Sequence, residues 1–285
     1  LTDWMAALTR PAALTHNHNV AIVGSSNKFN YRASIAYKDA QGIAKNSNRE
    51  ELMAKIAASQ KALDGKLNLQ YDLSYMMYRN DYFCGSFTQA AILNPTYPIY
   101  DPANANGFFK PTGTGTSNPV EQMMQKESYG DGNYFRGSVK ATINVKPTEG
   151  SLRINGFAAI EEGDNRSYWY NNTINTDQAG SGKAGRGNDM SFSKLFEVTA
   201  DYMRTFGNHN ITTVAGVSYQ NFMYDGSNIE NKGFPTDDAK YFQIGNGDAS
   251  KDYLTVSSYR NSNTLAAAFF RANYNYDNKY LLSAS

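Results

Sequence analysis

The stretch KLNLQYDLSYMMY, residues 66–78, decides the fold. From Leu67 to Met77 every odd-numbered residue is apolar or aromatic, whereas every even-numbered residue from Lys66 to Ser74 is polar. This two-residue period is typical of a β-strand with one apolar face. Soluble strands usually end after about five or six residues, but a tilted strand that crosses a bilayer needs roughly nine to eleven. The stretch therefore predicts one strand of a transmembrane β-barrel, with lipid on one face and a hydrated lumen on the other.

The composition of the chain leaves two fold classes open. The longest apolar run, residues 265–270, is far shorter than the roughly twenty residues of a membrane-spanning helix, so a membrane protein of this sequence must be a barrel. The 21 Tyr residues, against 2 Trp, suit the aromatic girdles of such a barrel, but they also suit a tyrosine-rich sugar-binding β-sandwich. The net charge of +1 gives no sign of a nucleic-acid partner.

Alternating segments elsewhere in the chain predict about ten antiparallel strands, arranged as hairpins. The predicted pairs of strands are 19–24 with 31–38, 53–59 with 66–78, 135–145 with 152–160, 196–202 with 211–219, and 270–276 with 280–284. Residues 1–15 are expected to form a connector with a short helix that Pro11 ends, and 16–285 to form the partial barrel.

The predicted connections alternate in length. Turns at 25–28, 61–65, 146–150, 206–210 and 277–279 alternate with longer segments at 39–48, 80–133, 161–189 and 221–263. Outer-membrane barrels have this asymmetry, with short turns in the periplasm and long loops outside the cell. Nothing in the architecture of a soluble β-sandwich requires short turns to alternate with long loops in this way.

The alternation assigns side chains to the two faces of the predicted barrel. The residues expected to face lipid are Leu67, Leu69, Tyr71, Leu73, Tyr75, Ile143, Ile154, Val198, Val217 and Tyr274. The residues expected to face the lumen are polar and of mixed charge: Arg32, Lys66, Asn68, Gln70, Asp72, Arg136, Lys140, Arg153, Glu197, Asp201 and Arg271. An alternative for the second set is an ordinary solvated face.

Short motifs along the whole chain resemble the SusC/RagA family of TonB-linked outer-membrane transporters. Near the start, TDWM (2–5), HNHN (16–19), NYRAS (30–34), QGI (41–43) and KNS (45–47) look like the first barrel strands of that family. Further on, NPTYP (94–98), TFG (205–207), AGVSYQ (215–220), FPTD (234–237) and NYNYDNKYLL (273–282) follow in the family's order and approximate spacing. Each motif alone is weak, but the ordered set is fairly specific.

This resemblance implies active import of large nutrients, oligosaccharides or sometimes peptides, across the outer membrane of a Gram-negative bacterium. It implies a SusD-like lipoprotein lid, and TonB acting through a plug domain that these residues lack. It also implies that the chain is an internal piece of a longer protein, with the connector joining the plug to a barrel of about 22 strands. The alternative is a non-transporting, β-rich glycan-binding surface protein or adhesin.

Residues for binding cargo are expected near the outer mouth, where aromatic faces and amide or carboxylate groups can act together. The candidates for contact with substrate or lid are Tyr97, Tyr100, Asp101, Tyr168, Trp169, Tyr170 and Asn171. Packing of the loops on themselves is the alternative role for these residues. The sequence contains neither a nucleophile triad nor a phosphate-binding loop, so we predict that the protein is not an enzyme and needs no cofactor or metal.

Overall fold

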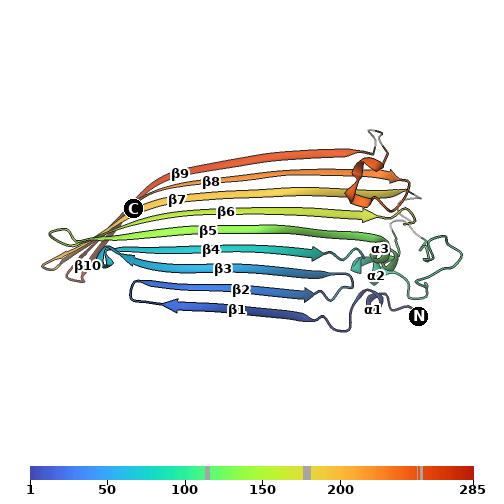
Figure 1. The fold of residues 1–285 in the computed structure, drawn as a ribbon, viewed down its shortest axis with the longest axis horizontal. Helices are drawn as coiled ribbons and strands as arrows, with labels where there is room; N and C mark the ends of the chain where they lie inside the picture. Colours follow the sequence, from blue (N-terminus) through green and yellow to red (C-terminus); the bar gives the residue numbers. More distant parts are fainter. Residues whose placement is uncertain (113–115, 176–180, 249, 251–252) are drawn as a thin grey trace.

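The computed structural model describes residues 1–112, 116–175, 181–248, 250 and 253–285, and it consists mainly of one antiparallel β-sheet (Figure 1). The described residues form ten strands, each paired with the next in chain order, which confirms the predicted all-β fold. These strands form a single sheet, so the sandwich that the composition left open is not the fold. Their bounds are β1 Thr15–Ser25, β2 Phe29–Gln41, β3 Asn48–Ala62, β4 Leu67–Asp81, β5 Lys126–Val145, β6 Ser151–Asn171, β7 Gly182–Phe206, β8 His209–Phe234, β9 Thr255–Tyr276 and β10 Tyr280–Ala284.

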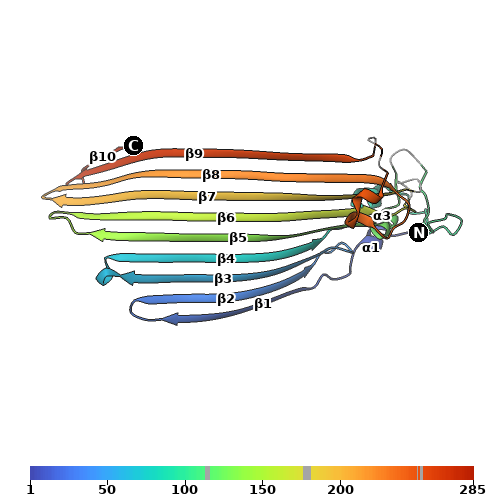
Figure 2. The ribbon, with the colours of Figure 1, turned by 45° about the horizontal axis from the view of Figure 1, so that its top comes forward.

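The sheet is open, because β1 and β10 each pair with only one of the described strands. Its short turns gather at one end and its longer connections at the other (Figures 1 and 2). The turn between β7 and β8 contains only two residues and starts with Gly207, whose φ is +53°. A residue with a left-handed backbone conformation at this position gives the turn a twist that matches the right-handed twist of the two strands.

Strands β5 to β9 extend much further than the alternation predicted. Most of 161–189 and 221–263, and the end of 80–133, were expected to be loops, but they form strand; residues 176–180, 249 and 251–252 of those loops lie outside the described part. The ladder between β5 and β6, for example, continues from Gly137 and Ile160 to Lys126 and Asn171. In these extensions polar residues and glycines occur on both faces of the sheet, so the strict apolar alternation that marks a half-buried strand is lost.

Three short helices lie at the end of the sheet that carries the long connections. They are α1 Trp4–Leu8, α2 Phe87–Ile92 and α3 Pro119–Gln125, and they share a small core built on Trp4, Leu8 and Met123. The short helix predicted within residues 1–15 is present, and it ends at Leu8, before Pro11. Asn118 caps α3 by accepting hydrogen bonds from the backbone amides of Val120 and Glu121.

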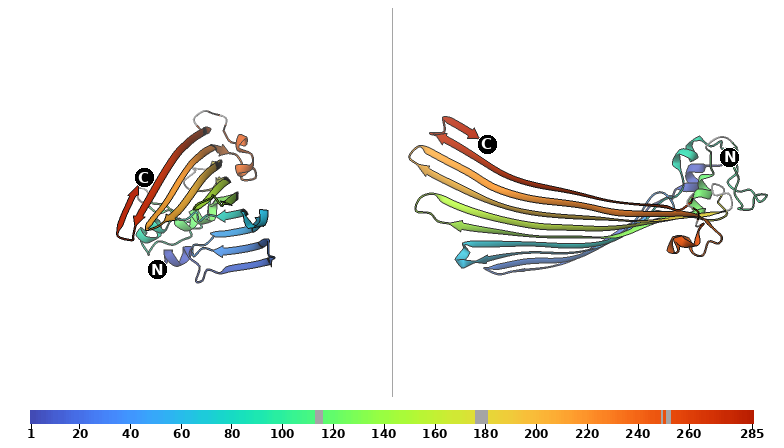
Figure 3. Two further views of the ribbon diagram at one scale, coloured as in Figure 1. Left: turned by 90° about the vertical axis from the view of Figure 1, so that its left-hand side faces the viewer. Right: turned by 90° about the horizontal axis from the view of Figure 1, so that it is seen from above.

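The described residues also form the 3₁₀ turns η1 Leu63–Gly65, η3 Lys240–Phe242 and η4 Ile244–Asn246. The segment with η3 and η4 lies on the opposite side of the sheet from helices α1 to α3 (Figure 3, right). No helix among the described residues combines the length and apolar character needed to cross a membrane.

Candidate functional site

The strand register separates the side chains of the sheet into two faces. Leu73 lies opposite Ile56 on β3 and Gly137 on β5, and Val198 lies opposite Val217. All ten residues predicted to face lipid share this face, which we call the apolar face. The other face, the polar face, carries the residues predicted to line the lumen. Lys66 is the exception, because it caps η1 and precedes β4.

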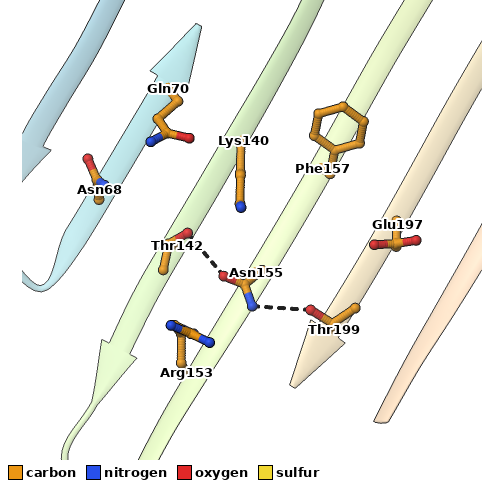
Figure 4. Close-up of a pocket in the computed structure, with 9 residues that line it drawn as sticks. All are labelled: Asn68, Gln70, Lys140, Thr142, Arg153, Asn155, Phe157, Glu197 and Thr199. Carbon is orange, nitrogen blue, oxygen red and sulfur yellow. Dashed lines mark hydrogen bonds between the residues drawn. The ribbon is translucent and has the colours of Figure 1, made fainter. Parts of the chain in front are cut away.

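The part of the polar face nearest the short turns is hollowed (Figure 4). The hollow has a volume of ≈ 530 Å³. Nine side chains from β4, β5, β6 and β7 line it: Asn68, Gln70, Lys140, Thr142, Arg153, Asn155, Phe157, Glu197 and Thr199. We call this set the polar patch.

Asn155 links three strands across the polar patch (Figure 4). Its Oδ1 accepts a hydrogen bond from Thr142 Oγ1 at 3.1 Å, and its Nδ2 donates to Thr199 Oγ1 at 3.1 Å and to Asp201 Oδ2 at 2.9 Å. The same Asp201 oxygen pairs with Arg153 Nε at 2.9 Å. These contacts hold the lower part of the polar patch in a fixed arrangement.

Lys140 and Glu197 form the charged upper part of the polar patch. They lie on either side of Phe157 in the register, on β5 and β7. Within the described part of the chain, neither charge has an ion pair or hydrogen bond. These two charges, on either side of the half-buried Phe157 ring, can bind a polar partner from the lumen side.

The predicted contact residues are divided between different places. Tyr97, Tyr100 and Asp101 lie in the connection between β4 and β5, close to the small helical core. Tyr97 packs against Phe109 with ring centroids 5.1 Å apart, and Asp101 accepts bonds from Ala103 N and Asn104 Nδ2. Self-packing of this loop therefore uses much of their binding capacity.

The remaining four predicted residues lie on β6, not in a loop, and therefore alternate between faces. Tyr168 and Tyr170 are on the apolar face, beyond its apolar stretch, where Asp237, Tyr241 and Ile244 of the connection between β8 and β9 pack over them. Tyr241 of η3 contacts Tyr168 at a ring-centroid distance of 5.6 Å, and Tyr170 Oη donates to Asp237 Oδ1 at 2.6 Å. Burial and the nearby Glu127 carboxylate raise the pKa of Tyr241 above its ordinary value. Only Trp169 and Asn171 lie on the polar face.

The sequence prediction missed polar-face residues in the strand extensions. Four tyrosines of the polar face, Tyr78, Tyr134, Tyr224 and Tyr259, surround a second hollow of ≈ 290 Å³. Two of them come from segments expected to be loops, so no face was assigned to them. Glycine recurring at two-residue spacing, as at Gly130 and Gly132, is the signal that could have indicated a strand with close cross-strand packing. In the described part of the chain, no group of three or more His, Cys, Asp or Glu side chains is placed to hold a metal ion.

Comparisons with known proteins agree with this geometry, although no family model matches the chain. TonB-dependent receptor P26 of Formosa agariphila is 27% identical over 287 residues, which cover 99% of this chain and 28% of that protein. TonB-dependent receptor SusC of Bacteroides thetaiotaomicron is 24% identical over 99% of this chain and 29% of that protein. The chain thus spans less than a third of these curated relatives. The resemblance that the motifs predicted is confirmed.

Solved structures share the fold. The RagAB peptide importer in its closed-closed state matches 96% of this chain and 31% of the importer chain, with a TM-score of 0.78 and 21% identity. The open-open state of the same importer gives a TM-score of 0.78 and 20% identity. The open ten-stranded sheet therefore corresponds to a portion of the barrel in transporters of this kind.

Proposed function

The chain is similar along nearly its whole length to SusC-like TonB-dependent receptors, and on that premise we propose that it forms part of an outer-membrane barrel that imports a large nutrient. The observation that carries the proposal is the contrast between the two faces of one continuous sheet. The apolar face exposes Leu73, Tyr75 and Val217, with 46%, 42% and 52% of their surface accessible. Such a face needs lipid to cover it, whereas the polar face suits a hydrated lumen.

The proposed partners follow from the same premise. A SusD-like lipoprotein closes the barrel on the outside, and TonB supplies energy through a plug domain. The cargo is an oligosaccharide or a peptide. The polar patch, with the free charges of Lys140 and Glu197, is the surface that we assign to contact with the plug or with passing cargo.

Residues 1–15 are proposed as the connector that leads into the barrel. Helix α1 packs against α2 and α3, at the end of the sheet with the long connections. A chain segment that arrives from the plug would therefore reach β1 from that end.

The proposed orientation puts the long connections outside the cell and the short turns in the periplasm. An epitope tag at the exposed Ala103 is expected to be stained on intact cells, because the connection between β4 and β5 lies outside. A tag at Lys146, in the turn between β5 and β6, is expected to be stained only after the outer membrane is opened. Staining in the opposite pattern would refute this orientation.

Import itself is tested with the complete receptor in its native host. Cells are given fluorescently labelled pools of oligosaccharides and of peptides, and uptake is measured with and without a functional TonB. We expect one pool to be taken up only when both the receptor and TonB are present. A receptor with an inactive TonB-contacting segment is the matched control, since it should still bind cargo at the surface. Uptake that persists without TonB would contradict active import.

A further inference from the structure

One row of side chains crosses six strands on the polar face and is nearly symmetric. The row runs Tyr78, Gly132, Asn165, Asp189, Gly226, Tyr259, each residue being opposite the next in the register of β4 to β9. A tyrosine next to a glycine stands at each end, and an amide and a carboxylate stand in the middle. On the other face, the neighbouring positions carry the ion pairs Arg166–Asp131 and Arg260–Asp225. The row therefore lies beyond the apolar stretch and outside the proposed bilayer.

The glycines allow each tyrosine to reach over the adjacent strand. A Cβ atom on Gly132 would lie 2.7 Å from Tyr78 Oη, and one on Gly226 would lie 2.5 Å from Tyr259 Cε1. The two hydroxyls donate inward, Tyr78 Oη to Asn165 Oδ1 at 3.1 Å and Tyr259 Oη to Asp189 Oδ1 at 2.9 Å. Any larger residue than glycine would push the rings off the sheet. The row is thus built around two tyrosines that converge on a polar centre.

The next row toward the short turns completes a groove. Tyr134 lies opposite Gly163, and Tyr224 lies opposite Ser191. Together the two rows enclose the hollow of ≈ 290 Å³ described above, which we call the aromatic groove. Tyr224 and Tyr259 are 52% and 48% exposed, so their side chains are accessible to a ligand.

The centre of the aromatic groove has spare hydrogen-bonding capacity. Asn165 uses its Oδ1 and Asp189 its Oδ1, while among the described residues Asn165 Nδ2 and Asp189 Oδ2 have no partner. The groove thus offers an amide donor and a carboxylate acceptor on adjacent strands, roughly 4.8 Å apart. The exposed Tyr224 and Tyr259 lie on one side of them, and the half-buried Tyr78 and Tyr134, each with an arginine over its ring, lie on the other.

We propose that the aromatic groove binds one ring of a neutral saccharide. A sugar ring presents C–H groups that pack on aromatic surfaces, and hydroxyls that both accept from an amide and donate to a carboxylate. The Asp189 charge disfavours acidic saccharides and phosphorylated ligands. A peptide backbone could pair with the same two groups through its N–H and C=O, but it lacks the C–H face of a sugar ring that packs on the exposed tyrosines. The inference rests on the proposed function, since it names the class of cargo.

The test measures binding to the purified complete receptor in detergent, where TonB plays no part. The probes are short neutral xylan, mannan and glucan oligosaccharides, fragments of polygalacturonate as acidic saccharides, and a tryptic digest of casein. We expect at least one neutral oligosaccharide to bind, with Tyr224→Ala and Asn165→Ala each weakening its Kd about tenfold, as loss of one well-packed or hydrogen-bonded contact does. Gln220→Ala, on the same face of β8 outside the groove, is the matched control and should leave Kd unchanged.

Tyr224→Phe keeps the aromatic ring and should bind saccharide like the wild type. Comparison with Tyr224→Ala therefore separates the effect of losing the aromatic surface from the effect of misfolding. Folding of each variant is checked by its heat-dependent migration on a gel. Binding of peptides alone, or saccharide binding that none of the groove variants weakens, would overturn the inference. Failure of the proposed import function would be seen in a different measurement. Uptake that does not depend on TonB, together with intact saccharide binding to the aromatic groove, would contradict active import but not the saccharide site.

Discussion

Leu73→Arg is expected to lower the free energy of unfolding of the complete receptor by about 2–4 kcal/mol, the cost of a cation near the bilayer midplane on a lipid-facing strand. Leu73 is 46% exposed in the open sheet, and its register neighbours Ile56 and Gly137 offer no charge to pair with. The measurement is denaturant unfolding of the receptor reconstituted in lipid vesicles.

Gln70→Arg is the matched control for Leu73→Arg, since both residues are on β4 but on opposite faces. Gln70 lies on the polar face and lines the polar patch, so an added charge there stays hydrated and should cost about 1 kcal/mol or less. Spin labels at the two positions give an independent measurement, because only the label at Gln70 should be reached by a water-soluble quencher. Equal costs, or equal access, would be incompatible with the assignment of the faces.

Expression of residues 1–285 alone is expected to give aggregated protein. The described sheet has two open edges, at β1 and β10, and each leaves a row of backbone amides and carbonyls without partners. In hydrocarbon each unpaired group costs several kcal/mol, and in water such an edge pairs readily with other chains. These strands therefore need further strands to close the barrel.

The outcome is read from outer-membrane fractions of cells that express either residues 1–285 or the complete receptor. The complete receptor, as control, should be inserted, resistant to protease and heat-modifiable on gels, while residues 1–285 should be in inclusion bodies. Protease-resistant, heat-modifiable insertion of residues 1–285 would contradict the expectation. It would favour a small barrel of ten strands closed on themselves, with a different register.

Strand prediction succeeded where the two faces of the sheet differ in polarity. In 66–78, and in the hairpin of 135–145 with 152–160, every second residue is apolar, and this pattern depends only on the sequence. It failed in 161–171 and 221–234, because polar and apolar residues there do not alternate with a two-residue period. There the backbone ladder with the neighbouring strands holds the extended conformation, and those partners are distant in the sequence.

The candidate site likewise contains residues that the alternation predicted and residues that it did not. Polar-face residues such as Asn68 and Lys140 could be assigned from alternation alone, and they lie together in the polar patch. Tyr168 and Trp169 were both predicted to contact substrate or lid, yet they lie on opposite faces because adjacent residues of a strand alternate. The residues around Asn165 and Asp189 were not predicted, since nothing local brings them together.

The sequence by itself therefore determined the all-β class, the ten strands, the two faces of the membrane-level segments and the order of short and long connections. Each of these depends on the period of apolar residues or on turn residues, which are properties of neighbouring positions. Only the tertiary structure decided how far the strands extend, which connection covers the apolar face near Tyr241, and which residues share a row across β4 to β9. A row such as Tyr78 to Tyr259 depends on the register of five successive strand pairs, and a one-residue slip in any pair would move its members to the other face.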